Sequence, residues 1–333
     1  MNYIGSKSKL SHWIKDEIKN IVGNDLSDKV FCDIFAGTGI IGRTFKSEVK
    51  RVISNDLEYY SFVLNRNYIG NHKDIRDKES YIEELNSLPL IDNGFIYQNY
   101  CKGSGSSRQY FSDNNGKKID TIRRKINELY YHKKIDDDLY YFLLGSLLES
   151  ADKVANTASV YGAFLKHIKK SASKDLILKS ANFSENSNSH QVFNEDSNQL
   201  IKKIEGDILY LDPPYNQRQY GSNYHILNSI SKYEPFTPKG ITGLPDYNRS
   251  NYCKKRVVKI EFEKLIDNAN FKYIFLSYNN EGLMSECEIK NIMKKYGRYS
   301  LVKKEYQRFK SDKTDARNHK ADKTYEYLHI LQK

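Results

Sequence analysis

Short apolar runs and polar turns alternate in the first part of the chain. Leu10–Ile21 places its apolar side chains on one helical face, and the apolar run Val30–Phe35 has the length of a buried strand. Ile40–Phe45 then predicts a second helix, and Arg51–Asn55 predicts a second strand that ends at Asp56. This order of strand, turn, helix and strand is typical of an α/β fold with a parallel sheet.

The same alternation returns in the last part of the chain. It predicts a strand at Gln191–Asn194, a helix at Ser197–Ile204, strands at Ile208–Leu211 and Tyr273–Ser277, and a terminal pair of strands at Tyr299–Phe309 and Tyr325–Leu331. We therefore expect residues 1–69 and 190–333 to form one α/β core.

The middle of the chain, residues 70–189, has a different pattern. Helical spacing is found at Ile119–Tyr131, after the acidic run Asp136–Asp138, and at Val160–Lys170. Acidic residues favour the first turn of a helix, so the run at Asp136 indicates a helix start. We expect residues 70–189 to form a largely helical insertion.

Composition adds information on partners and location. The net charge is +11, which favours a polyanionic partner, although a lysine-rich solvated surface explains it equally well. The N-terminus lacks an apolar signal region, and the longest apolar stretch, Leu139–Leu148, is too short to span a bilayer. The four cysteines, at positions 32, 101, 253 and 287, have neither zinc-ligand nor disulfide-framework spacing. We expect a cytoplasmic protein without membrane contact and without a metal.

A glycine turn follows the first predicted strand. In the run Asp33–Gly39, the residues Gly37 and Gly39 allow positive φ and a close approach of the backbone to a ligand. Asp56, at the end of the next strand, could accept both ribose hydroxyls of an adenosine. A nicotinamide cofactor and S-adenosylmethionine both fit this pattern, and a purely structural turn is the alternative.

The run Asp212–Tyr215, with the sequence Asp-Pro-Pro-Tyr, directly follows the predicted strand Ile208–Leu211. Two prolines fix φ and remove two backbone donors, which stiffens the turn and leaves its carbonyl oxygens outward. Ligands of open α/β sheets bind at this end of the strands. Structural double-proline turns are common, but an aspartate before the prolines and a tyrosine after them are rarer.

Together these motifs resemble the adenine-N6 DNA methyltransferases of the Dam-like class. The matching segments are Tyr3–Lys7 as an N-terminal cofactor motif, Asp33–Gly39, Asp56, Asn194–Asp196, Asp212–Tyr215, and Phe275–Asn279 as a later strand motif. The cofactor motifs precede the catalytic one, which is the order of the family's α group. Residues 217–225 are more similar to restriction-modification members than to housekeeping members.

The resemblance implies a Rossmann-like class I S-adenosylmethionine-dependent methyltransferase sheet with the helical insertion. It implies cofactor contacts from Tyr3, Lys7, Asp33, Phe35, Gly37, Gly39, Asp56, Asp196 and Asp212. The implied catalytic residues are Asp212, Pro213, Pro214 and Tyr215. The Asp212 side chain and the Pro213 carbonyl would accept the two N–H bonds of the target amine, and Tyr215 would stack on the base.

The resemblance also implies double-stranded DNA as substrate, with the target adenine extruded from the helix. It further implies a restriction-modification role, with a separate endonuclease encoded nearby and no obligate protein partner. The DNA-contact candidates are Arg218, Tyr278, Arg249, Lys254 and Lys255. The basic clusters Arg123–Lys125, Lys166–Lys170 and Lys254–Arg256 could follow phosphates, although a solvated surface explains each cluster more simply. Residues 70–189 and the polar, basic segment 236–256 are the candidate target-recognition regions.

Other reactions fit less well. Cytosine-C5 methylation needs a cysteine nucleophile, usually after a proline, and no cysteine of this chain follows a proline. Cytosine-N4 enzymes usually carry serine where Asp212 stands. Adenine methylation of RNA stays open, as does a catalytically inactive methyltransferase fold that binds DNA, although the intact Asp212, Gly37, Gly39 and Asp56 argue against the latter.

Overall fold

The computed structural model describes residues 7–307 and 323–333, which fold into two compact units. One unit, the sheet unit, comprises, within the described ranges, residues 7–57, 186–219 and 249–333. The other, the helical unit, comprises Glu58–Glu185 and Tyr220–Asn248. The sheet unit carries the predicted motifs, and each unit has its own hydrophobic core.

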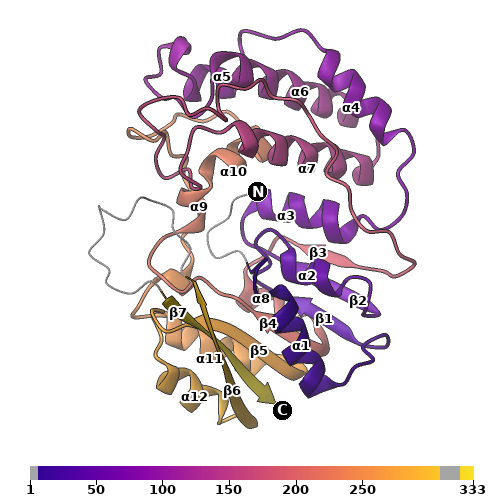
Figure 1. Cartoon of the computed structure of the whole chain (residues 1–333), viewed down its shortest axis with the longest axis vertical. Coiled ribbons are helices and arrows are strands. Elements are labelled where there is room, and N and C mark those ends of the chain that lie inside the picture. Colours follow the sequence, from indigo (N-terminus) through magenta and orange to yellow (C-terminus); the bar gives the residue numbers. More distant parts are fainter. Residues whose placement is uncertain (1–6, 308–322) are drawn as a thin grey trace. The chain divides into compact units, whose positions relative to one another are not determined.

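The sheet unit is built on a seven-stranded sheet in the order β3-β2-β1-β4-β5-β7-β6 (Figure 1). Its strands are β1 (Val30–Asp33), β2 (Arg51–Asn55), β3 (Gln191–Phe193), β4 (Glu205–Leu211), β5 (Asn270–Asn279), β6 (Arg298–Gln307) and β7 (Lys323–Gln332). Neighbours from β3 to β5 pair in parallel, and β7 pairs antiparallel with both β5 and β6. The strand order reverses between β1 and β4, where open α/β sheets bind ligands. The predicted Rossmann-like sheet and its terminal strand pair are confirmed.

Helices cover both faces of this sheet. They are α1 (Ser11–Val22), α2 (Ile40–Phe45), α8 (Ser197–Leu200), α11 (Val258–Asn268) and α12 (Glu286–Met293), with a short 3-10 turn η3 (Asn251–Cys253). Successive strand residues point to opposite faces. Cys32 and Leu209 therefore pack in one core with Phe262 of α11. Phe31 faces the other way and stacks on Phe45 of α2 with ring centroids 4.3 Å apart.

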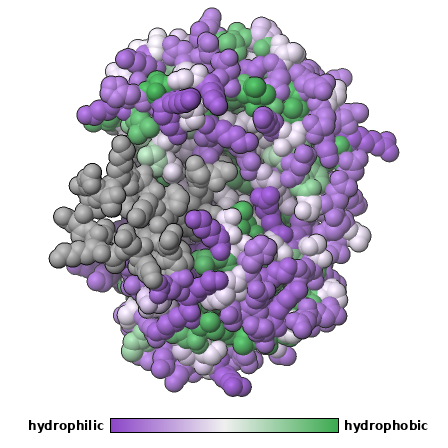
Figure 2. Space-filling view, viewed as in Figure 1, coloured by the Kyte–Doolittle hydropathy of each residue, from purple (hydrophilic) through white to green (hydrophobic). Residues whose placement is uncertain are grey.

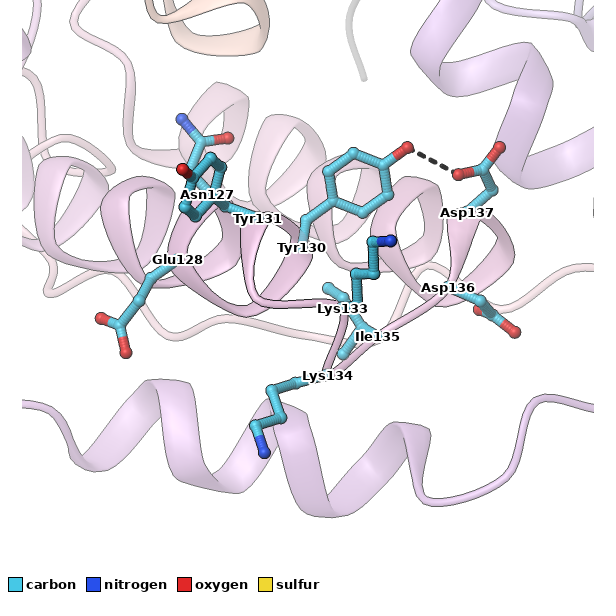
Figure 3. Close-up of a pocket in the computed structure, with 9 residues that line it drawn as sticks. All are labelled: Asn127, Glu128, Tyr130, Tyr131, Lys133, Lys134, Ile135, Asp136 and Asp137. Carbon is cyan, nitrogen blue, oxygen red and sulfur yellow. Dashed lines mark hydrogen bonds between the residues drawn. The ribbon is translucent and has the colours of Figure 1, made fainter.

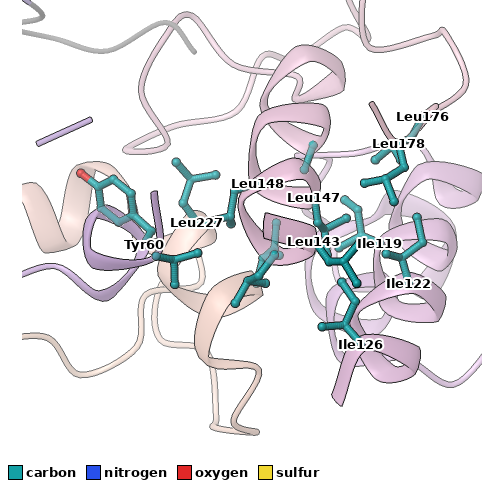
Figure 4. Close-up of a cluster of buried hydrophobic side chains, with 14 of the residues drawn as sticks. Tyr60, Ile119, Ile122, Ile126, Leu143, Leu147, Leu148, Leu176, Leu178 and Leu227 are labelled. Carbon is teal, nitrogen blue, oxygen red and sulfur yellow. The ribbon is translucent and has the colours of Figure 1, made fainter. Parts of the chain in front are cut away.

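The helical unit is organised around two long amphipathic helices. Its elements are α3 (Tyr59–Asn65), η1 (Arg66–Gly70), α4 (Lys78–Ser87), α5 (Phe95–Tyr100), η2 (Lys102–Ser104), α6 (Asp113–Tyr131), α7 (Asp137–Val154), α9 (Tyr220–Asn223) and α10 (His225–Lys232). Ile119, Ile122 and Ile126 of α6 lie in one core with Leu143 and Leu147 of α7, at the spacing of one helical face (Figure 4). Side-chain caps begin both helices, Ser112 at α6 and, as the acidic run predicts, Asp136 at α7.

The unit boundaries differ from the prediction in two places. The helical unit begins at Glu58 rather than at residue 70, and it includes Tyr220–Asn248, which we expected in the α/β core. The reason is the apolar face of α10, where Ile226, Leu227 and Ile230 join the core of the helical unit. The predicted core of residues 190–333 is thus interrupted, and the segment 236–256 is divided between the units.

The predicted helix at Val160–Lys170 is wrong, because this segment consists of turns and bends. Side-chain amides donate hydrogen bonds to backbone carbonyl groups that would accept from backbone N–H groups in a helix. Gln109 Nε2 donates to the carbonyl of Leu165 at 2.7 Å and also to that of Lys166. Asn156 Nδ2 donates to the same Leu165 carbonyl at 3.0 Å. These bonds fix a non-helical path that the local sequence pattern does not reveal.

None of the helices in the described ranges is long and apolar enough to cross a membrane. Hydrophilic residues dominate the face shown in Figure 2, and hydrophobic residues appear there as separate small patches. Scattered apolar side chains of this kind are usual on protein surfaces.

Candidate active site

Three carboxylates lie at the carboxyl ends of adjacent strands of the sheet unit. Asp33 ends β1, Asp56 follows β2 directly, and Asp212 follows β4 directly. The parallel register pairs Asp33 with Ser54 on one side and with Tyr210 on the other. The three acids therefore meet at one edge of the sheet, beside the point where the strand order reverses.

The glycine turn after β1 takes the conformation that its sequence predicts. Gly37 and Gly39 have φ of 53° and 76°, values that favour residues without a side chain. The backbone N–H of Gly37 donates to Asp56 Oδ2 at 2.8 Å, which joins the turn to the end of β2. Phe35 packs edge-on against Tyr252 with ring centroids 4.9 Å apart. The turn is thus fixed from both sides.

Asp33 is buried, and in the described part of the chain its Oδ1 has no hydrogen-bond partner. Burial raises the pKa of this carboxyl well above its usual value, and the charges of Asp212 and Asp56 raise it further. Hydrogen bonds with the backbone of Gly42 and Phe35 act in the opposite direction. Perturbed, incompletely satisfied carboxyls in proteins cluster at functional sites.

Asp212 is held by a buried lysine. Lys7 Nζ lies 3.0 Å from Asp212 Oδ1 and 3.2 Å from Glu326 Oε1. Burial raises the pKa of Asp212 to about 6, against the effect of Lys7, and Glu326 raises it as well. Burial alone would lower the pKa of Lys7, but the charges of Asp212 and Glu326 raise it well above the usual value. Lys7 is therefore positively charged between two carboxyl groups.

The rest of the Asp-Pro-Pro-Tyr motif forms a fixed turn next to this ion cluster. Pro213 is buried, and the Tyr215 carbonyl accepts a hydrogen bond from the Leu283 N–H at 3.0 Å. The Tyr215 ring centroid lies 6.0 Å from Lys7 Nζ. Burial raises the pKa of Tyr215, which keeps its hydroxyl neutral. An acidic side chain and an aromatic ring are thus presented together at the end of β4.

Comparison with known proteins assigns the chain to a family. Residues 3–292 match the model of the D12 class N6 adenine-specific DNA methyltransferases, a range that includes the glycine turn and the Asp-Pro-Pro-Tyr motif. The chain belongs to this family. The resemblance seen in the sequence is thereby confirmed, and the protein is an enzyme that methylates adenine at N6 in DNA.

Individual relatives agree. The methyltransferase is 63% identical over 333 residues to the Type II methyltransferase M.NlaIII of Neisseria lactamica, an alignment that covers 100% of this chain and 99% of that protein. It is 36% identical to the Type II methyltransferase M.CviAII of Paramecium bursaria Chlorella virus 1, over 91% of this chain and 90% of that protein. It is 38% identical to the Type II methyltransferase M.FokI of Planomicrobium okeanokoites, over 89% of this chain but 47% of that longer protein.

Two predicted cofactor residues of the methyltransferase have structural partners of their own. Lys7 contacts Asp212 and Glu326, as described. Asp196 caps α8, with Oδ1 accepting from the N–H of Asn198 at 2.9 Å. Tyr3 lies outside the described residues. The roles of all three toward a cofactor stay predictions.

Four of the predicted DNA contacts come together on the sheet unit. The Gln219 side chain accepts from the Ser250 N–H at 2.8 Å and donates to its carbonyl at 3.3 Å. The Cys253 thiol donates to the carbonyl of Arg218 at 3.4 Å. These bonds join two chain segments that carry four exposed basic side chains, which we call the basic joint: Arg218, Arg249, Lys254 and Lys255.

The fifth predicted DNA contact is wrong. Tyr278 is 1% exposed, and its hydroxyl accepts a hydrogen bond from the Met284 N–H at 3.3 Å. Gly282 lies so close to the ring that an added Cβ would approach a Tyr278 ring carbon to 2.1 Å. Tyr278 is therefore a core residue of β5 without a free face for a base. Its position near a strand end is what makes it resemble a site residue in the sequence.

The basic clusters of the helical unit are also partly structural. Arg123 is buried and donates to the carbonyls of Ile230 and Ser231, both at 2.8 Å. Lys169 Nζ donates to the Thr157 carbonyl at 2.7 Å. Neither side chain can follow phosphates in this conformation. By contrast, Arg124 is exposed on the next position of α6.

A turn in the helical unit presents one apolar side chain on a rigid backbone. Lys239 and Leu244 pair through two backbone hydrogen bonds of 2.9 and 2.8 Å. Between them, each of four consecutive carbonyls accepts a side-chain hydrogen bond. Arg108 donates to the carbonyls of residues 240 and 241, through Nη2 at 3.0 Å and Nε at 3.2 Å. His225 Nε2 donates to the carbonyl of residue 242 at 3.0 Å, and the Tyr100 hydroxyl donates to that of residue 243 at 2.8 Å. Ile241, at the tip, is 84% exposed. We call this segment, residues 239–244, the clamped turn.

The helical unit also has a hollow at the α6–α7 connection (Figure 3). The Tyr130 hydroxyl donates to Asp137 Oδ1 at 2.7 Å across it. Its lining residues are Asn127, Glu128, Tyr130, Tyr131, Lys133, Lys134, Ile135, Asp136 and Asp137. None of the predicted site residues is among them, so we assign it no part in methyl transfer.

Glu326 is the buried acid beside Lys7 that sequence reasoning missed. A signal was present, because Glu326 alternates with Leu328 and Ile330 within a predicted strand and therefore shares their face. An acid on the apolar face of a strand is unusual and needs a buried partner. That partner, Lys7, lies at the other end of the sequence and cannot be found from local pattern.

Proposed function

We propose that this methyltransferase transfers the methyl group of S-adenosyl-L-methionine to N6 of adenine within a specific double-stranded DNA sequence. The observation that carries the proposal is the position of Asp212–Tyr215. This turn lies at the carboxyl end of β4, one strand away from the glycine turn after β1. A predicted cofactor site and a predicted acceptor site therefore share one edge of one sheet.

The residues at this edge fit the cofactor. Asp56 offers carboxylate oxygens for ribose hydroxyls and is fixed by the Gly37 N–H. Gly37 and Gly39 adopt positive φ and carry no side chain, so the backbone of the turn can approach the cofactor closely. Asp33 adds a buried carboxyl whose Oδ1 has no partner among the described residues. When bound, S-adenosyl-L-methionine supplies an electrophilic methyl group on a positively charged sulfur.

The role of the Asp-Pro-Pro-Tyr residues follows from the weakness of the nucleophile. The lone pair of the adenine N6 is delocalised into the ring, so the amine must be pyramidalised before it can react. Asp212 and the Pro213 carbonyl accept its two N–H bonds and thereby localise the lone pair. Positioned acceptors of this kind act mainly by orientation and preorganised electrostatics. Asp212 need not be a strong base, because the amine proton can leave to water after transfer.

The target base must leave the helix to reach these residues. Tyr215 offers a ring at the same turn, and a stacked aromatic ring offsets the lost base stacking by about 1–3 kcal/mol. Its hydroxyl is neutral, and the hydrogen bond of its carbonyl with the Leu283 N–H holds the backbone from which the ring projects. Tyr215 is therefore the proposed platform for the extruded adenine.

The basic joint is the proposed phosphate contact, because its four side chains are exposed and lie in the same unit as Asp212. Target recognition is assigned to residues 70–189 and to the segment 236–256. The clamped turn supports this assignment. Three side chains hold its backbone while Ile241 is left in solvent, an arrangement suited to inserting an apolar side chain at a base step.

The biological setting is proposed from the relatives. M.NlaIII, M.CviAII and M.FokI are each named Type II methyltransferases, and M.NlaIII aligns with the whole chain. We propose that the methyltransferase is the modification enzyme of a restriction-modification system. A separate endonuclease that recognises the same sequence would be its functional counterpart.

The proposal is tested by transfer of a tritiated methyl group from S-adenosyl-L-methionine to duplex DNA, with mapping of N6-methyladenine in the DNA of an expression host. Wild type should modify one short sequence. Asp212→Ala should reduce transfer by at least about 10²–10³-fold, as expected for loss of a positioned transition-state group. DNA binding should be retained in Asp212→Ala, because the basic joint is unchanged.

Asp28→Ala is the matched control, since Asp28 is an exposed aspartate of the same unit that pairs with Lys29. It should methylate DNA at the wild-type rate. Wild-type enzyme that binds cofactor and DNA but never forms N6-methyladenine would contradict the proposal. Methylation of RNA alone would move the substrate assignment to RNA.

A further inference from the structure

Glu326 is a buried acid that none of the predicted motifs includes. It lies on β7, opposite Asn279 of β5, and is 1% exposed. The Ser277 hydroxyl donates to Oε1, the same oxygen that contacts Lys7 Nζ at 3.2 Å. An isolated buried carboxylate is costly, so a position of this kind needs compensating partners. Glu326 has two such partners, and one of them, Lys7, connects it to the catalytic turn.

Lys7 is shared between two carboxyl groups. Its ammonium lies 3.0 Å from Asp212 Oδ1 and 3.2 Å from Glu326 Oε1. In the proposed mechanism, the second carboxylate oxygen of Asp212, Oδ2, accepts an N–H of the target amine. A lysine without a second anchor could move along the carboxylate and cover both oxygens. Glu326 prevents this by holding the ammonium on one side.

We propose that Glu326 is a positioning residue for methyl transfer, which anchors Lys7 and thereby orients the Asp212 carboxylate toward the target amine. The proposal rests on the proposed role of Asp212. It assigns Glu326 no contact with substrate. Its effect is carried through Lys7, and the Ser277 hydroxyl keeps the Glu326 carboxylate in place.

The charges of this cluster give the proposal a distinctive pH signature. Burial raises the pKa of Asp212 to about 6, Lys7 lowers it, and Glu326 raises it. Removal of the Glu326 charge should therefore lower the pH at which the methylation rate falls on the acid side, the acid limb of the pH–rate profile. Removal of the Lys7 charge should move it to higher pH. The other groups that interact electrostatically with Asp212 are Asp33, Tyr210 and Tyr215, which both variants leave unchanged.

The experiment compares Glu326→Gln and Lys7→Met with wild type in single-turnover methylation of duplex DNA across pH. Glu326→Gln is expected to lower the rate at least about tenfold, because a misplaced acceptor loses orientation. The cofactor and DNA affinities of Glu326→Gln should stay within about twofold of wild type. The acid limb should shift down in Glu326→Gln and up in Lys7→Met. A merely structural role would lower cofactor and DNA affinity together with the rate, whereas a positioning role lowers the rate alone.

Glu286→Gln is the control, since Glu286 forms an exposed pair with Lys303 in the same unit at 2.8 Å. It should leave rate and pH profile unchanged. If Glu326→Gln does not fold, as judged by its melting curve, Ser277→Ala replaces it. Removing that hydroxyl loosens Glu326 without removing a charge, and it should lower the rate severalfold without lowering cofactor affinity.

The outcomes separate the two proposals. Wild-type activity at N6 of adenine together with a wild-type rate and an unmoved acid limb in Glu326→Gln overturns this inference alone. Wild-type behaviour of Ser277→Ala overturns it in the same way when Glu326→Gln cannot be measured. Absence of N6-methyladenine with the wild-type enzyme overturns both the inference and the proposed function.

Discussion

Buried charged groups in the helical unit are saturated by hydrogen bonds. Asp120 accepts from two backbone N–H groups of α5, at 2.9 and 2.8 Å, and from the Tyr233 hydroxyl at 2.5 Å. Arg123 donates to the carbonyls of Ile230 and Ser231. Each charge is compensated by backbone dipoles that folding itself brings into place. Such groups fix a structure and leave little free for chemistry.

Buried charged groups in the sheet unit are crowded instead. Asp33 and Glu326 are buried and Asp212 is partly buried, and the buried ammonium of Lys7 contacts Asp212 and Glu326. Burial and the charge of Asp212 raise the pKa of Asp33 well above its usual value. Its Oδ1 lacks a hydrogen-bond partner among the described residues. Crowding of like charges costs stability and is retained where function uses it. The contrast separates residues that build the fold from residues that we propose to act in methyl transfer.

The largest effect expected in the helical unit is on stability. Arg123→Met should lower the free energy of unfolding by about 3 kcal/mol, because buried carbonyl groups lose charged donors. Arg124→Met, at the adjacent but exposed position, should cost less than about 1 kcal/mol. Urea unfolding measures both values. A fall in DNA affinity with unchanged stability in Arg123→Met would break the comparison, because it would make Arg123 a phosphate contact.

The next effect is on cofactor binding in the sheet unit. Asp56→Ala should weaken binding of S-adenosyl-L-methionine by roughly thirtyfold, the equivalent of one charged hydrogen-bonding group. Asp207→Ala is the matched control, since Asp207 also accepts a backbone N–H at 2.8 Å, from Val30, but at the other end of the strands. Calorimetric titration distinguishes them. Equal reductions of affinity would show that Asp56 acts only through folding.

The smallest effect is expected at the basic joint. Replacing both Lys254 and Lys255 by glutamine should weaken DNA binding severalfold and reduce the slope of log affinity against log salt by about 2, because each lysine is expected to neutralise one phosphate. Lys203 and Lys264, both exposed, provide the control pair. Fluorescence anisotropy at several salt concentrations measures the slope. An identical slope for both double variants would remove the basic joint from the DNA-binding surface.

Much of the sheet unit could be predicted from the sequence. The strands alternate in apolar pattern, and the acids that follow them are read directly from strand ends, as with Asp33, Asp56 and Asp212. The glycine turn is specified locally by Gly37 and Gly39, whose backbone angles few other residues adopt. These features depend on neighbouring residues, which is why pattern alone predicts them.

What the sequence could not supply depends on distant partners. Arg123 belongs to a basic run, yet its burial is decided by two carbonyl groups of α10. Lys7 and Glu326 lie near opposite ends of the chain and meet only because β7 pairs with β5. The prediction for Tyr278 fails because its surroundings, which include Met284 and Gly282, enclose the ring. The local hydropathy pattern predicts where a helix or strand lies, but it does not predict which polar side chains will find hydrogen-bond partners in distant segments.

The central claim is that the Asp212 carboxylate accepts from the target amine. Its most direct test is the single-turnover rate of DNA methylation by wild type and by Asp212→Asn, measured between about pH 5 and pH 8. With its pKa raised to about 6, Asp212 loses its charge as pH falls through that value, so the wild-type rate should fall there and level off above it. Asp212→Asn should be slow and should lack this acid limb. A variant that keeps the wild-type rate, or the same acid limb, would contradict the account.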